Sequence, residues 1–150
     1  MNKLDLHHSI SSSLKPVSGS ISDIISEIDQ LSVLSSDEYL TSSPSILYSI
    51  ANTALYLSDK YSKFPFDYSV IYLSELYKAK NFDYGDSFCR VRSKVPKAIL
   101  VRLYDKAYRA DTLLSSNSAQ VNESLYDTLV DLANYAILEL IEIYARQGSV

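Results

Sequence analysis

The chain has 150 residues, a formal net charge of −4 and a hydrophobic fraction of 47%, with three glycines, four prolines and one cysteine. This length allows one domain with a core of its own, residues 1–150, and the single cysteine excludes a disulfide framework. The acidic balance disfavours a long nucleic acid as partner, because its phosphates would be repelled.

Residues 1–20 are rich in serine and end in the stretch KPVSGS, which is typical of turns. We expect a loose, flexible arm there, with His7 and His8 solvated rather than bound to a metal. The start lacks the apolar segment of a signal peptide, and no run of about 18 apolar residues is present to span a membrane. These features predict a cytoplasmic protein without membrane contact.

The rest of the chain, residues 21–150, alternates helical periodicity with short breaks, which predicts an all-α bundle of about five helices. The stretch SSNSAQVN is a short polar connection, so the last two helices are expected to form an antiparallel C-terminal hairpin. The segment NFDYGDSFCRVRSKV, residues 81–95, is expected to be a shaped loop. The five helices are expected over 21–34, 45–62, 68–80, 96–115 and 122–146.

Three carboxylates follow one line of the helix expected over 122–146. At about 100° per residue, Glu123, Asp127, Asp131 and Asn134 fall within a wedge of about 80°, opposite the apolar residues that must face the core. Like charges four residues apart repel by roughly 0.2–0.5 kcal/mol per pair. An opposite charge or a cation is needed to offset that repulsion.

The helix expected over 96–115 carries a basic row, which consists of Arg102, Lys106 and Arg109. One interpretation is that the acidic and basic lines pair with each other or are solvated, and each exposed ion pair then contributes about 0–1 kcal/mol. The other is a site in which the carboxylates hold Mg²⁺, which completes its shell with water and substrate phosphate, while the basic row binds the phosphate. Both interpretations stay open.

The stretch KNFDYGDSF has similar ambiguity. Gly85 allows a ligand to approach the backbone closely, and Phe82 and Tyr84 offer ring faces on which a base can stack. The alternative is an ordinary turn that ends a helix, with an aromatic side chain anchored in the core.

Three stretches, KNFDYGDSF, RLYDKAYRADTL and ESLYDTLVDLANYAI, resemble in this order a phage and bacterial family called nucleotide modification associated domain 1. The resemblance covers roughly residues 75–140 and implies work on nucleotides. It also implies that the matched positions surround one site. These positions are Lys80, Asp83, Tyr84, Gly85, Arg102, Lys106, Arg109, Glu123, Asp127, Asp131 and Asn134.

The pattern is also distantly similar to the all-α nucleoside triphosphate pyrophosphatases, whose Mg²⁺ sites set an acidic pair on one helix against E-x-x-D on another. This chain departs from that arrangement. Glu123 and Asp127 are four residues apart rather than three, and Glu75 stands alone where a pair is expected. Whether the protein is an enzyme therefore stays undecided.

The leading hypothesis is a phage-type protein of the host cytoplasm that binds a phosphorylated nucleotide, linear or cyclic. It would handle modified nucleotides or sequester a nucleotide signal of host defence, with Lys80, Asp83, Tyr84, Gly85, Arg102, Lys106, Arg109 and Asn134 as ligand-binding residues. Mg²⁺, if bound, would be held by Glu123, Asp127 and Asp131. The alternatives are a Mg²⁺-dependent pyrophosphatase-like hydrolase and a non-catalytic helical interaction module. Ile137 and Ile141 continue the acidic line as apolar residues, which favours a homo-oligomer built through the last helix.

Overall fold

The computed structural model describes residues 2–84, 87–116 and 121–147, without the side chains of 80–84 and 121–123. Within these ranges every regular element is a helix, so the prediction of an all-α fold is confirmed. None of the described helices is long and apolar enough to cross a membrane. The helices are α1 (Lys3–Ser13), α2 (Ile21–Ser32), α3 (Ser36–Tyr61), α4 (Phe66–Tyr84), α5 (Ser87–Lys94), α6 (Ala98–Leu114) and α7 (Val121–Gln147).

The expectation of a loose arm over residues 1–20 is wrong, because residues 3–13 form α1. Asn2 caps this helix by accepting a hydrogen bond from the backbone N–H of Asp5 at 2.8 Å. Ile10 is buried, and His7, which we expected to be solvated, is buried and stacks on Tyr77 of α4 with ring centroids 4.4 Å apart. Because serines occupy several positions of α1, its sequence lacks the apolar periodicity that predicts a helix.

The helix α2 agrees with its prediction, but α3 begins at Ser36 rather than at residue 45. Ser35 and Glu38 form a capping box that starts α3 earlier. Pro44 has no N–H to donate, yet the helix continues through it, and the side chain of Ser43 donates a hydrogen bond to the carbonyl of Tyr39. We took this proline as the start of a helix, whereas it lies within one.

The shaped loop expected over 81–95 is also wrong for most of its length. α4 continues to Tyr84, and residues 87–94 form α5. The side chain of Arg92 anchors α5 by reaching Glu139 of α7, a contact across 47 positions of sequence that no local pattern reveals. Gly85 and Asp86 lie outside the described residues, which leaves seven described helices where five were expected.

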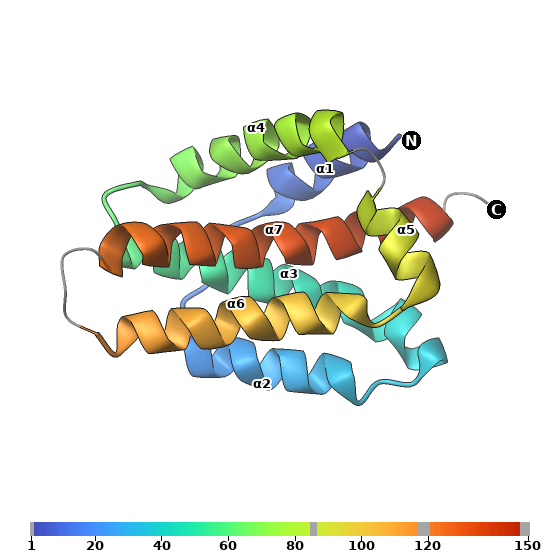
Figure 1. Cartoon of the computed structure of the whole chain (residues 1–150), viewed down its shortest axis with the longest axis horizontal. Helices are drawn as coiled ribbons and strands as arrows, with labels where there is room; N and C mark the ends of the chain where they lie inside the picture. Colours follow the sequence, from blue (N-terminus) through green and yellow to red (C-terminus); the bar gives the residue numbers. More distant parts are fainter. Residues whose placement is uncertain (1, 85–86, 117–120, 148–150) are drawn as a thin grey trace.

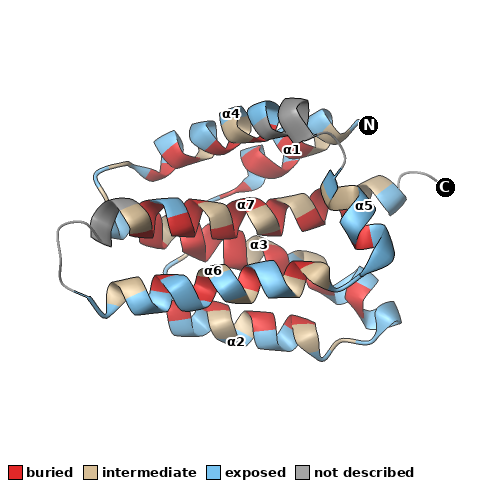
Figure 2. Ribbon diagram, viewed as in Figure 1, coloured by how far each residue is buried: buried red, intermediate tan, exposed pale blue. Residues whose placement is uncertain are grey.

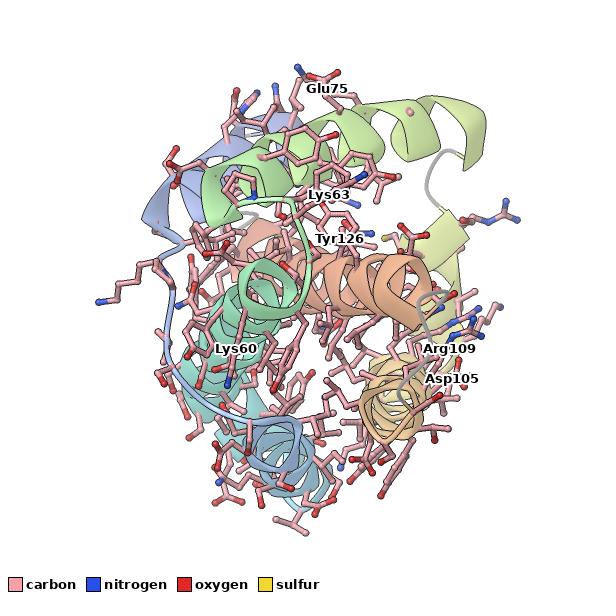
Figure 3. All side chains as sticks on the ribbon, turned by 90° about the vertical axis from the view of Figure 1, so that its left-hand side faces the viewer. Lys60, Lys63, Glu75, Asp105, Arg109 and Tyr126 are labelled. Atoms are coloured by element: carbon pink, nitrogen blue, oxygen red, sulfur yellow. The ribbon has the colours of Figure 1, made fainter. Side chains whose placement is uncertain are left out.

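The helix α7 is the centre of the bundle. It packs most extensively on α3 and α6 and also contacts α1 and α4, while α2 covers the far side of α3 and α6. Figure 1 shows α7 between α4 and α6, with α5 crossing one end of this layer. End on, in Figure 3, α4, α7 and α6 again follow one another in this order.

Burial follows from this arrangement, because α7 has neighbours on most of its circumference. Figure 2 shows buried residues concentrated along α7 and α3. Ile137 and Ile141, which we expected on a dimer surface, are 0% and 2% exposed within the single chain. They are covered by neighbouring helices and are not available to a second copy.

Candidate functional site

The hairpin of α6 and α7 has the predicted antiparallel arrangement. Its helices pack because α6 buries an apolar stripe against the apolar side of α7. The register follows from two contacts, since Arg102 lies by Tyr135 and Lys106 lies by Asp131. The buried stripe of α6 consists of Ile99, Leu103, Ala107 and Ala110, and α7 contributes Leu125, Leu129, Leu132, Ala136 and Leu140 to the same core.

The basic row lies along the edge of α6 that adjoins α7. Lys106 Nζ is 3.3 Å from Asp131 Oδ2, in an ion pair whose side chains are 23% and 31% exposed. The guanidinium of Arg102 is 5.9 Å from the centroid of the Tyr135 ring, within the range of a cation–π contact. Arg109 is exposed and projects from α6 on the side of the molecule where α5 lies, as Figure 3 shows.

The acidic line meets the basic row at one position. Asp131 pairs with Lys106, as the ion-pair interpretation predicts, whereas Asp127 is exposed. The side chain of Glu123 lies outside the described residues. Among the residues that are described, no three His, Cys, Asp or Glu side chains lie close enough together to hold a metal ion. The Mg²⁺ site of Glu123, Asp127 and Asp131 therefore stays a prediction.

Asn134 brings an amide into the same face of α7 but is only 3% exposed. Its Oδ1 has no hydrogen-bond donor among the described residues. A buried polar atom left unpaired costs about 1–3 kcal/mol, so such an atom needs an explanation. A ligand that donates a hydrogen bond to this oxygen is one explanation, and the position of Asn134 one turn from Asp131 fits it.

The remaining predicted ligand residues lie at the end of α4. Lys80, Asp83 and Tyr84 belong to its last turns, and their side chains lie outside the description, as does Gly85. Of the predicted residues of α6 and α7, the structure brings Lys106 and Asp131 into direct contact. It leaves the contribution of the α4 end as a prediction.

One polar cluster was missed by the sequence analysis. Glu139 is fully buried and accepts hydrogen bonds from Arg92 Nε at 2.7 Å, Arg92 Nη2 at 3.1 Å and the Tyr39 hydroxyl at 2.6 Å. Burial alone would lower the pKa of Arg92, but the hydrogen bonds and charge of Glu139 raise it, so the guanidinium stays charged. The sequence did indicate this cluster, because Glu139 lies within the apolar run AILELIEIY and a buried carboxylate needs a cation.

Comparison with known families agrees with the resemblance noted in the sequence. Residues 80–143 match the family model of nucleotide modification associated domain 1, a segment that includes α5, α6 and most of α7. No curated protein and no solved structure is significantly similar to the chain. The match covers α6 and most of α7 but not residues 1–79, and the description of the family suggests a nucleotide-related role.

Proposed function

We propose that this protein, of which residues 80–143 match nucleotide modification associated domain 1, binds a phosphorylated nucleotide on the exposed face of the α6–α7 hairpin. The basic row is the observation that carries this function. It places three cationic side chains along one edge of α6, although the chain as a whole is acidic. A compact polyphosphate can use such a local row, whereas a long nucleic acid would also meet the acidic remainder of the surface.

The contacts of the basic row suit a phosphate ligand. Arg102 is exposed while its guanidinium lies near the Tyr135 ring, and an arginine stacked in this way can still donate its N–H groups to phosphate oxygens. The pair of Lys106 and Asp131 is only partly buried, so exchanging the carboxylate for a phosphate costs little.

Two further groups supply polar recognition beside the basic row. The unpaired Oδ1 of Asn134 is buried, so it can accept a hydrogen bond from the sugar or the base once the side chains that cover it move aside. Asp127 is exposed and can contribute one carboxylate to a Mg²⁺ ion that the phosphates bring with them. In a phage-encoded protein, such binding can serve modified-nucleotide handling or the sequestration of a defence signal in the host cytoplasm.

Calorimetry with ATP, dATP and a cyclic dinucleotide, each with and without Mg²⁺, tests this function. We expect stoichiometric binding of at least one of them, and a loss of about tenfold or more in affinity in Arg102→Gln and Arg109→Gln, because each change removes a charged hydrogen bond. Arg146→Gln is the matched control, since Arg146 is exposed in the last turn of α7. Equal affinities in all three variants would refute the proposal, and release of pyrophosphate would favour the hydrolase instead.

A further inference from the structure

A row of aromatic rings lies at the start of α4, before the segment that matches the nucleotide-associated family, and one ring of α7 joins it. Phe64 and Tyr68 stack with ring centroids 4.9 Å apart and an interplanar angle of 17°, and Tyr68 and Tyr72 follow at 6.5 Å and 7°. The ring of Tyr126 in α7 is tilted relative to the rings of Phe64 and Tyr72, and its centroid lies 4.8 Å and 6.5 Å from theirs. We name Phe64, Tyr68, Tyr72 and Tyr126 the aromatic shelf.

The aromatic shelf is both exposed and fixed in position. Tyr68 and Tyr72 are 45% and 37% exposed, although aromatic rings of this size usually bury more of their surface. Their helix is held by buried Phe66 and Leu73, and the hydroxyl groups of Ser69 and Tyr126 are hydrogen-bonded at 3.1 Å. Ring faces that are rigid before a ligand arrives lose little conformational entropy when it binds.

The aromatic shelf and the basic row lie on opposite flanks of the same stretch of α7. Tyr126 contacts the α4 side and Asp131 contacts Lys106 on the α6 side. At about 100° per residue, the exposed Asp127 lies between these two positions on the helix surface. The pKa of Tyr126 is raised by burial first, and the charge of Asp127 adds to it, which agrees with their proximity.

The distance between the two flanks suits a nucleotide. Crossing one helix with its side chains takes roughly 10 Å, and an extended nucleoside polyphosphate is of comparable length. Figure 3 shows Tyr126 and Lys63 between α4 and α7, and Arg109 on α6 across α7. A base on one flank would therefore leave its phosphates near the other.

The surroundings of the aromatic shelf favour a single base over a polyanion. Asp67 and Glu75 are exposed on the same helix, so Lys60 and Lys63 do not make the area strongly basic. Stacking on an aromatic ring needs no charge and grows with the area of the base, so a purine gains more than a pyrimidine.

We infer that the aromatic shelf, chiefly Tyr68 and Tyr72, binds the purine base of the nucleotide whose phosphates contact the basic row. This inference rests on the proposed function. It adds a binding site for the base, which Arg102 and Arg109 do not contact. It also assigns a role to residues 64–72, which precede the matched segment.

The test compares ATP, CTP and inorganic tripolyphosphate by calorimetry on the full chain. Wild type should bind ATP more tightly than CTP and CTP more tightly than tripolyphosphate. Tyr72→Ala should weaken the affinity for ATP by about fivefold to 150-fold, because it removes one stacking ring. The affinity for tripolyphosphate should stay unchanged. Tyr72→Phe, which keeps the ring, should bind as wild type does.

Tyr108→Ala is the matched control. Tyr108 is 53% exposed and stacks on Tyr104 at 5.9 Å, with the same spacing of four residues, but Tyr104 bonds to Asp29 of α2 and the pair lies away from α7. This variant should keep wild-type affinity, and thermal melts of all variants check that they fold. Wild type binding tripolyphosphate as tightly as ATP, or Tyr72→Ala binding ATP normally, overturns this inference alone. A wild type that binds none of the three probes overturns this inference, and the proposed function falls with it if dATP and the cyclic dinucleotide also fail to bind.

Discussion

Asn134 and Glu139 are two polar residues that α7 carries into the interior, and their partners differ. Glu139 is surrounded by donors from Arg92 and Tyr39, whereas Asn134 Oδ1 has none among the described residues. The first arrangement holds structure together, and the second costs stability. A cost that folding alone does not explain is typical of residues kept for binding.

We therefore expect Asn134→Leu to raise the free energy of unfolding by about 1 kcal/mol, because leucine has a similar size and no polar atom to leave unpaired. The same variant should bind nucleotide more weakly. Asn52→Leu is the control, since Asn52 is also buried but its Oδ1 accepts a hydrogen bond from the Lys15 backbone N–H at 3.1 Å. Urea unfolding should show that this second change lowers stability. A destabilised Asn134→Leu would mean that its amide is structural.

At the scale of elements, α5 is attached to the bundle mainly by two side chains, Arg92 and the partly buried Phe88, which packs against the core. It contacts α6 only sparsely, and Arg92, 7% exposed, connects it to Glu139 in the core. The exposed face of α5 carries Arg90 and Lys94, which make no such connection in the described structure. One buried ion pair and the packing of Phe88 therefore hold α5 at the end of the α4, α7 and α6 layer.

Arg92→Leu should lower the free energy of unfolding by about 3–5 kcal/mol, because it leaves the carboxylate of Glu139 buried without a cation. Adding Glu139→Gln should recover part of that loss, since the amide removes the uncompensated charge and can still bond to Tyr39. Arg90→Leu, an exposed change on the same helix, should stay within about 0.5 kcal/mol of wild type. Denaturant titration of the four proteins measures these differences, and a double variant no more stable than Arg92→Leu would contradict the explanation.

At the scale of the whole molecule, the N-terminal helix α1 packs as part of the bundle and is not a flexible arm. α1 packs on α7 and α4, and Lys3 forms an ion pair with Glu142 at 2.8 Å. His7 lies inside this interface, stacked on Tyr77, and its Nδ1 is 3.3 Å from the hydroxyl of Ser11. Burial first, and then the positive charges of His8 and Lys78, lower the pKa of His7 to about 4.

This shift makes global stability depend on pH. The unfolded chain protonates His7 near pH 6.5 but the folded one only near pH 4, so stability is highest above about 6.5 and falls as the pH drops between these values. Wild type should lose about 2 kcal/mol between pH 7 and pH 5 through this residue. The stability of His7→Phe should fall correspondingly less between pH 7 and pH 5, while the pH dependence of His8→Ala should resemble that of wild type. Parallel stability profiles for wild type and His7→Phe would contradict this account.

The buried face of a helix could be predicted from the sequence where the spacing of apolar residues in that helix alone determines it. The spacing of Leu125, Leu129 and Leu132 indicated the buried side of α7. Pairing of the acidic and basic lines was one of two open interpretations, and Lys106 and Asp131 do form an ion pair. Prediction from the sequence failed where distant partners decide the structure. The burial of His7 depends on Tyr77 and the helicity of residues 87–94 on Glu139, so neither could be read from neighbouring residues.

The central place of α7 has a consequence for how the protein is made. Residues up to Leu114 are synthesised before Val121–Gln147, yet α1, α3, α4 and α6 all pack against that helix in the folded protein. Until it emerges, the nascent chain exposes the apolar side chains of these helices to water and to other proteins. Productive folding must then wait for the last helix, and chaperones that shield apolar nascent segments should matter during this interval.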